Sequence, residues 1–250
     1  FFVMGFMIGP LLGHVFLETL DITYRILFQI TSFILATAII SSLLISRRSI
    51  TNHHERFSFL SIKEMKKFPE VIIMLIFCTS SFGIILSIYP AFLDDSGMSD
   101  KDILLLYFAF GISRVISLAL AGKFSRKTSQ TLIAATIAIS VGLVISVVSH
   151  SIIMFALALV LMGFGFSIFF PLTLEIILSK TSKGISGKII GAYETIFGVG
   201  WAIGPAIGGQ ITQAFGKDSP YFVFFIIGMG VTILAVIFRK KLEPRRIQNF

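Results

Sequence analysis

Long apolar runs fill almost the whole of this chain, and their length decides what it can fold into. There are eight such runs, at residues 1–17, 26–46, 70–92, 103–122, 129–148, 152–178, 187–212 and 221–238. Most of them reach the ~20 residues that a helix needs to cross the hydrocarbon core of a bilayer. Backbone groups find no water in lipid, so only helices or a closed barrel can span it. The runs lack the alternating pattern of barrel strands, and the sequence therefore predicts an all-α integral membrane protein.

The basic residues are sorted between the two sets of connections. If the even-numbered spans end in the cytoplasm, all but four of the 21 Lys and Arg residues lie on that side; the exceptions are Arg25, Lys101, Lys217 and, within a span, Arg114. The positive-inside rule predicts this bias, so we expect a multi-pass cell-membrane protein whose central loop and C-terminus are cytoplasmic. The net charge of +8 then reflects topology and contact with membrane lipid, and it requires no nucleic-acid partner.

Two spans carry similar patterns of glycine and proline. The first has Gly5, Gly9, Pro10 and Gly13, and the seventh, six spans later, has Gly198, Gly204, Pro205, Gly208 and Gly209. Small residues on one helix face allow two helices to approach closely. In the seventh span we expect that face to consist of Gly187, Gly191, Thr195, Gly198, Ala202 and Gly209. Two interpretations stay open: a contact that moves during a transport cycle, or close packing without motion.

At these residues the chain resembles a transporter of the major facilitator superfamily, in its antiporter branch. The stretch GFMIGPLLG (Gly5–Gly13) is similar to the fifth-span motif G-x-x-x-G-P-x-x-G-G, with His14 in place of the last glycine. The stretch AGKFSRKTSQ (Ala121–Gln130) is similar to the loop motif between the eighth and ninth spans. In that loop Gly122, Arg126 and Lys127 match in type, whereas Ser125 stands where an acidic residue is expected. FGFSIFFP (Phe164–Pro171) is similar to the tenth-span pattern.

The resemblance implies a helical bundle with eight of an expected twelve transmembrane helices. Residues 1–46 would be the last two spans of the N-terminal half, 47–69 the cytoplasmic central loop, 70–239 the six-span C-terminal half and 240–250 a cytoplasmic tail. The chain begins within an apolar run, so we expect it to be the C-terminal part of a longer protein. Parallel halves of this kind fit the repeated glycine pattern.

Polar residues within spans are the candidates for a substrate cavity, because ionisable groups are costly in lipid. Arg114 would hold an anionic group, or would be a structural arginine near the inner surface. Glu194 would carry a proton, or would be a structural partner of Arg114 or of the basic loops. Hydrogen-bonding side chains in the third span complete the set: Ser80, Ser81, Ser87 and Tyr89. The hydroxyls of that span have the alternative of bonding back to their own helix.

The resemblance implies a secondary active transporter that exports small amphipathic compounds by alternating access, with protons as the candidate coupling ion. Uptake of a sugar or an organic anion on the same fold is the alternative, and a transport-incompetent membrane fragment is another. Partners would be membrane lipid and a small-molecule substrate, and a monomer is expected. No phosphate-binding loop or zinc-ligand spacing occurs in the sequence, so we expect no cofactor, no metal and no enzymatic activity.

Overall fold

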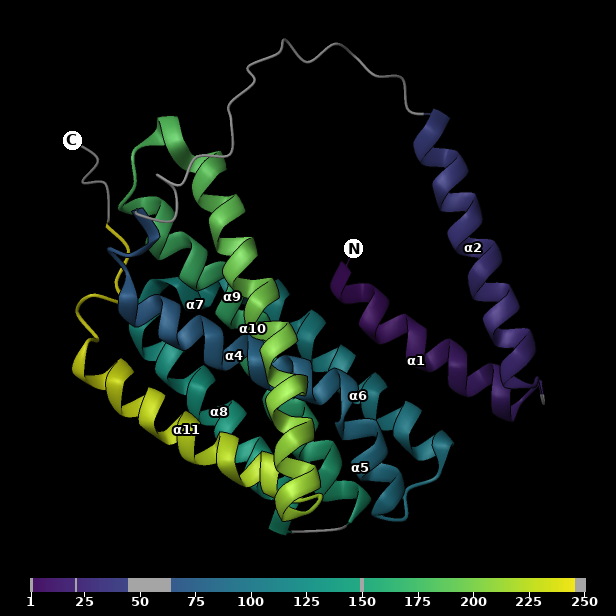
Figure 1. Ribbon diagram of the computed structural model, residues 1–250. Coiled ribbons are helices and arrows are strands. Elements are labelled where there is room, and N and C mark those ends of the chain that lie inside the picture. Colours follow the sequence, from purple (N-terminus) through teal and green to yellow (C-terminus); the bar gives the residue numbers. More distant parts are fainter. Residues whose placement is uncertain (1, 21, 45–63, 149–150, 246–250) are drawn as a thin grey trace.

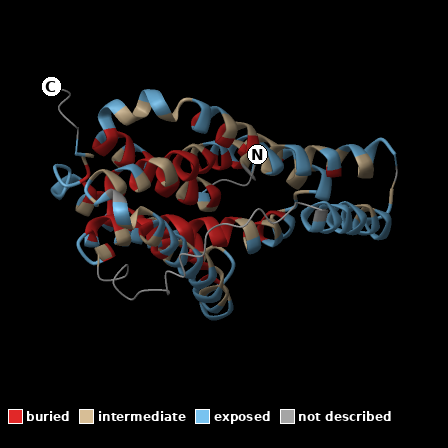
Figure 2. Ribbon diagram, turned by 90° about the horizontal axis from the view of Figure 1, so that it is seen from above, coloured by how far each residue is buried: buried red, intermediate tan, exposed pale blue. Residues whose placement is uncertain are grey.

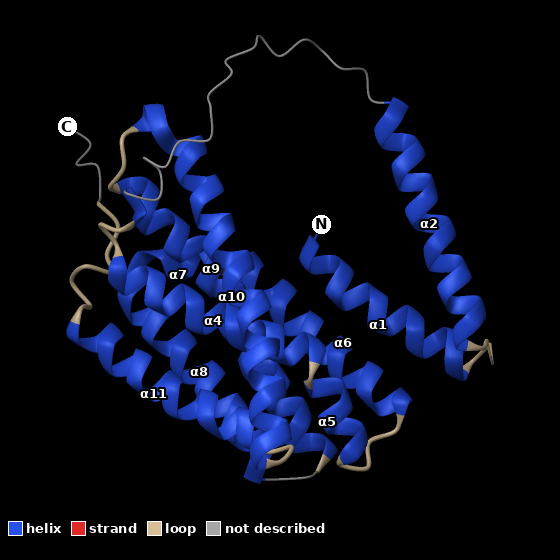
Figure 3. Ribbon diagram, in the orientation of Figure 1, coloured by secondary structure: helices blue, strands red, loops and turns tan. Residues whose placement is uncertain are grey.

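Helices are the regular structure of this protein. The computed structural model describes residues 2–20, 22–44, 64–148 and 151–245, and within these ranges there is no strand (Figure 3). The helices are α1 (Phe2–Glu18), α2 (Tyr24–Leu44), α4 (Pro69–Ser87), α5 (Tyr89–Asp95), α6 (Asp100–Ala119), α7 (Ala121–Phe124), α8 (Thr128–Val148), α9 (Ile152–Ser179), α10 (Ser186–Phe215) and α11 (Ser219–Ile237). The all-α prediction is confirmed. Most of the central loop expected at 47–69 lies outside the described residues.

Six helical stretches are long and apolar enough to cross a membrane among the described residues. They are α2, α4, α6, α9, α11 and the stretch Ala121–Val148, which consists of α7, the turn after it and α8. The other two expected spans, α1 and α10, do not meet both the length and the hydropathy of a membrane span, each for its own reason. Helix α1 is apolar but short, at Val3–Glu18. Helix α10 is 30 residues long, but its glycines and its charged Lys188 and Glu194 make it less apolar than its neighbours. The chain is an integral, multi-pass membrane protein.

Local sequence explains where several helices begin and end. Helix α4 begins at Pro69, because the N–H that proline lacks would have no partner within the helix in the first turn. The third apolar run divides into α4 and α5 at Ile88, next to Pro90. Ser99 starts α6 through a capping box, in which its hydroxyl accepts from the backbone of Asp102 and its own N–H donates to that carboxylate.

The helices from α4 to α11 pack into one bundle with a continuous buried core. Neighbouring pairs are α8 with α9, α10 with α4, α6 with α9 and α11 with α8. Figure 2 shows the buried residues concentrated in this bundle. Two buried tyrosine hydroxyls are satisfied inside it, because Tyr89 lies 2.7 Å from Ser146 Oγ and Tyr193 lies 2.7 Å from Thr173 Oγ1. The assignment of this bundle to one half of a transporter stays a prediction.

The two N-terminal helices lie beside this bundle. Helix α1 packs along α6, whereas α2 stands further out and has few described neighbours (Figure 1). Every described side chain from residue 31 to 43 of α2 is exposed. Helix α6 is therefore the part of the bundle that α1 contacts. Together these two helices form one wall of the cavity described next.

Candidate functional site

A cavity of about 880 Å³ lies among α4, α6, α9 and α10, and Val3 of α1 reaches it. It lies toward the end of the bundle where α6 and α9 finish and where α1 and α10 begin. The wall is mainly apolar and aromatic, with a small number of polar groups. The lining residues used below are Phe82, Phe166, Phe170, Phe197 and Trp201, together with Cys78, Arg114, Ser167, Glu175 and Glu194. Concave, mostly apolar sites of this size are typical of small-molecule binding.

Arg114 is the one buried arginine among the described residues, and it lies on the wall of this cavity. It is only 6% exposed. Its guanidinium carbon lies 4.5 Å from the ring centre of Phe6, 4.8 Å from that of Phe82 and 5.5 Å from that of Phe110. Its Nε donates to Ser167 Oγ at 3.3 Å. Aromatic faces attract cations, which explains how this charge is held between α1, α4 and α6.

The acidic residues of the cavity come from α9 and α10. Glu175 and Glu194 line the wall, and both side chains are exposed. Neither pairs with Arg114, because no Asp or Glu oxygen lies within 4.0 Å of that guanidinium in the part of the chain that the structure describes. The alternative in which Glu194 is the structural partner of Arg114 has no support in this geometry.

Four hydroxyl residues proposed for the cavity lie elsewhere. Ser80 faces α10 and donates to Gly200 O at 2.9 Å, and Ser81 and Ser87 donate to carbonyls of their own helix. Tyr89 is fully buried beside Ser146 and stacks edge-on to Tyr221. None of the four is among the residues that line the 880 Å³ cavity.

Glycines of α10 form a close contact with α4. A Cβ on Gly204 would lie 2.1 Å from Ser80 O, and one on Gly200 would lie 1.9 Å from Thr79 Oγ1. A Cβ on Gly208 would meet Ile88 at 2.9 Å. The opposing helix contributes Gly83, where a Cβ would lie 2.4 Å from Trp201 O and 2.9 Å from Pro205 Cδ. Helices α4 and α10 can approach this closely only because both carry glycine at the contact.

This contact face differs from the one that the sequence predicts. Gly204, Gly208 and Pro205 are part of it, but Gly198 and Gly209 have no atom of a neighbouring described element within 4 Å of a Cβ. The reason is helical geometry: the contacts at 200, 204 and 208 recur every four residues, and residue 198 is two positions out of step with them. Gly198 lines the cavity instead.

The first-span glycines are packed less closely. Among the described residues nothing lies within 4 Å of a Cβ on Gly5 or Gly9, and Gly13 would meet Leu104 Cδ2 at 3.4 Å, an ordinary contact. The close approach of α1 and α6 occurs instead at Gly111, whose Cβ would lie 2.5 Å from both Met7 Cα and Phe6 O. Pro10 lies inside α1 without interrupting it.

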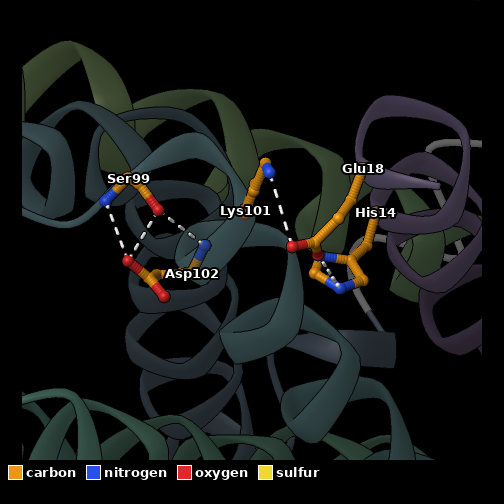
Figure 4. Close-up of polar contacts among 5 residues, drawn as sticks. All are labelled: His14, Glu18, Ser99, Lys101 and Asp102. Carbon is orange, nitrogen blue, oxygen red and sulfur yellow. Dashed lines mark hydrogen bonds and ion pairs between the residues drawn. The ribbon is translucent and has the colours of Figure 1, made fainter. Parts of the chain in front are cut away.

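Polar contacts join α1 and α2 to the start of α6, at the end of the bundle away from the cavity. Lys101 Nζ lies 3.4 Å from Glu18 Oε1, and His14 Nε2 lies 2.7 Å from Glu18 Oε2 (Figure 4). The hydroxyl of Tyr24 donates to the Asp100 carboxylate. The Lys101–Glu18 pair therefore joins α1 to α6 at this end, and the Tyr24–Asp100 hydrogen bond joins α2 to α6.

Comparison with known proteins agrees with this architecture. The sequence profile of the Major Facilitator Superfamily matches residues 1–145 and 119–249. The chain belongs to the major facilitator superfamily. Two similar proteins are both named quinolone resistance protein NorA, from Staphylococcus aureus strains MRSA252 and Mu50 / ATCC 700699. They are 26% and 25% identical to this chain over 162 residues. The match covers 62% of this chain and 40% of each relative, so the chain spans less than half of their length in this comparison.

Membership of the superfamily points to membrane transport rather than to catalysis. It also confirms the resemblance inferred from the glycine and loop motifs. The loop motif itself is exposed: Gly122 has open space around it among the described residues, and Arg126 and Lys127 belong to a short 3-10 turn, Ser125–Lys127. Ser125, in the acidic position of the superfamily motif, donates its hydroxyl to Gly122 O at 3.0 Å.

A carboxylate from the C-terminal region lies beside this loop instead. Glu243 Oε1 accepts from the backbone N–H of Ser129 at 3.3 Å and from the Ser129 hydroxyl, in the first turn of α8. A carboxylate is favourable at a helix N-terminus, where free N–H groups and the helix dipole attract negative charge. The sequence motif could not reveal this contact, because Glu243 is 114 residues away.

Most of the aromatic wall was also missed from the sequence. Glu194, Phe197, Gly198 and Trp201 recur at three- and four-residue steps, so they share one face of α10. Because Glu194 was predicted to line the cavity, this spacing could have predicted that Phe197 and Trp201 line it as well. Phe166, Ser167 and Phe170 lie within the FGFSIFFP stretch of α9.

Proposed function

We propose that the complete protein exports small amphipathic compounds across the cell membrane in exchange for protons, by alternating access. The observation that carries the proposal is the 880 Å³ cavity, in which aromatic side chains surround a small set of charged groups. A compound with an apolar body and a polar group suits such a wall. The NorA relatives are named for resistance to quinolones, and that name supports export as the direction.

The position of the cavity supports alternating access. It lies toward one end of the bundle, and at the other end Gly13, Glu18 and Tyr24 contact α6. A site that is reached from one side at a time requires this kind of asymmetry. On the positive-inside orientation, the cavity lies toward the cytoplasm and the α1–α6 contacts lie toward the outside.

Glu194 is the candidate for carrying the proton. It belongs to α10 and lines the cavity, so a proton bound there would compete with or accompany a substrate. Carboxylates inside membrane proteins are frequent members of proton pathways. Glu175 is the second candidate, nearer the end of α9.

Uptake of an organic anion is the second candidate function, and Arg114 is the observation that favours it. A buried cation on the cavity wall suits a negatively charged solute in either direction of transport. Direction therefore has to be measured separately from substrate charge.

Export is tested with the protein expressed from its natural, complete gene in cells that lack their own drug exporters. We expect lower accumulation of ethidium and of the quinolone norfloxacin than in cells without the gene. In inside-out vesicles, an imposed pH gradient should drive uptake of both compounds, and Glu194→Gln should weaken that pH dependence. Equal accumulation with and without the gene would contradict export, and transport that ignores the pH gradient would contradict proton exchange.

Orientation is tested by cysteine labelling, because Cys78 is buried and is the single cysteine of the sequence. A membrane-impermeant maleimide added to intact cells should label Lys217→Cys and should fail to label Lys123→Cys. Both positions are exposed, so access alone decides the result. The reverse pattern would overturn the cytoplasmic placement of the basic connections.

A further inference from the structure

We propose that Arg114 is the anchor for an anionic group of the bound compound, so that the cavity selects amphiphiles that carry a carboxylate beside an apolar, aromatic body. The inference rests on the proposed function only in requiring that compounds enter this cavity. It goes further in naming the charge that is recognised and the side chain that recognises it.

The first step is the surroundings of the guanidinium. Arg114 is 6% exposed, and its guanidinium lies over the rings of Phe6, Phe82 and Phe110. Burial there removes most of the water that would hydrate the charge. Aromatic faces offset part of that loss, but they accept no directional hydrogen bond comparable to that of a carboxylate.

The second step is the hydrogen-bond inventory. A guanidinium has five N–H donors and accepts none. In Arg114 the Nε donates to Ser167 Oγ at 3.3 Å, while Nη1 is buried and has no hydrogen-bond partner among the described residues. A buried donor without an acceptor is unfavourable, and a carboxylate is the acceptor that matches the planar fork of arginine.

The third step is the shape of the wall around that donor. Phe82 joins the aromatic groups into one surface: its ring centre lies 5.1 Å from that of Phe166 and 5.4 Å from that of Trp201. Phe197 continues the surface, 6.1 Å from Trp201. A ligand whose carboxylate meets Arg114 would therefore place its apolar body against these rings.

The acidic residues of the cavity do not supply the missing acceptor. Glu175 and Glu194 are exposed, and neither lies within ion-pair distance of Arg114. Among the described residues that line the cavity, Arg114 is therefore the buried charged group without an ion-pair partner. A second, cationic group on the ligand is compatible with Glu194, which makes zwitterionic amphiphiles part of the same class.

The experiment uses two dyes that differ only at the group in question, rhodamine B with its free carboxylate and rhodamine B ethyl ester. The complete protein is purified in detergent, and binding is followed by the fluorescence anisotropy of each dye. We expect the acid to bind roughly ten- to a hundredfold more tightly than the ester, as expected for a charge-assisted hydrogen bond. In Arg114→Gln that preference should disappear through weaker binding of the acid, while the ester binds as before.

Two further variants separate recognition from folding. Arg114→Lys keeps the charge without the planar fork, so it should retain part of the preference. Arg239→Gln makes the same change at an exposed arginine that is not among the cavity-lining residues, and it should leave the preference for the acid in place. Equal binding of acid and ester by the parent, binding of neither dye, or equal weakening of both dyes in Arg114→Gln would each overturn the proposal.

The result is independent of export. If the acid is preferred through Arg114 but ethidium and norfloxacin accumulate equally with and without the gene, the proposed export function fails and the anion site stands. If both dyes are exported but Arg114→Gln affects them equally, export stands and the anion site fails.

Discussion

Helices α1 and α10 carry the same arrangement of glycine and proline, but they use it differently. Gly5, Gly9, Pro10 and Gly13 of α1 correspond in spacing to Gly200, Gly204, Pro205 and Gly208 of α10. In α10 a Cβ added at any of the three glycines would clash with atoms of α4 or of Ile88 at its end. In α1 the first two have no neighbouring described element within 4 Å of a Cβ, and the close approach to α6 depends on Gly111 of the partner helix.

The difference shows that a small-residue pattern permits close packing without deciding where it occurs. The α4–α10 contact has glycines on both helices and a side-chain hydrogen bond, from Ser80 to Gly200 O. The α1–α6 contact has one close glycine and then relies on polar groups at its far end, where Lys101 meets Glu18. We therefore expect the first contact to be the more rigid of the two.

The largest effect is expected for Gly204→Ala. Its new Cβ would lie 2.1 Å from Ser80 O and 2.7 Å from Ser80 C, so the two helices would have to separate. Overpacking typically costs about 1–3 kcal/mol and occasionally more, and we expect the upper part of that range because the opposing atoms belong to the backbone. Thermal unfolding of the complete protein in detergent should show a much lower midpoint. Gly209→Ala in the same helix is the matched control and should change the midpoint little, and similar midpoints for the two variants would remove the basis of the comparison.

A smaller loss is expected for Gly111→Ala at the α1–α6 contact. Its Cβ would lie 2.5 Å from Met7 Cα, so α1 would shift while the rest of the bundle stays packed. A short thiol cross-linker between Gly13→Cys and Leu104→Cys should report this as a lower cross-linking yield. Gly9→Ala, which meets open space, should leave the yield unchanged. An unchanged yield in Gly111→Ala would show that α1 does not rest on this glycine.

Ser80→Ala sharpens the comparison on the α10 side by removing the hydrogen bond to Gly200 O, which is 2.9 Å long. Hydrogen bonds between membrane helices contribute on average about 0.6 kcal/mol, so we expect a small but measurable drop in the unfolding midpoint. Ser87→Ala, whose hydroxyl bonds only within its own helix, is the control. A drop of equal size in both variants would mean that the bond between helices adds nothing specific.

The smallest effect is expected for Lys101→Ala at the far end of the α1–α6 contact. The two side chains are 50% and 44% exposed, so solvent and salt screen the pair. Exposed ion pairs contribute about 0–1 kcal/mol at most, and less at high ionic strength. The difference in unfolding midpoint between parent and variant should be small in low salt and should vanish in high salt. A large difference that persists in high salt would make this end as rigid as the α4–α10 contact.

Properties that depend on long segments could be predicted from the sequence. The length of the apolar runs was sufficient to predict the helical class. Arg114 and Glu194 were recognised as candidates because charge within an apolar run is rare and costly. The structure places both on one cavity wall, although their roles remain proposals.

Properties that depend on which faces meet could not be predicted. The choice between Gly198 and Gly200 as contact residues depends on how α4 crosses α10, and one helix does not contain that information. The same holds for the aromatic wall, because Phe82, Phe166 and Trp201 come together from three helices. Glu243 reaches the start of α8 across more than a hundred residues, and no local pattern links them.

Trp201 has an optical consequence. It is the single tryptophan of the 250-residue sequence, it lines the cavity, and its ring lies 5.4 Å from Phe82. Indole emission from this chain therefore arises at the cavity wall and nowhere else in it. The wavelength and intensity of this emission would report whether water or an organic molecule lies next to the ring. Trp201 is therefore an intrinsic fluorescent reporter of ligand binding in the cavity.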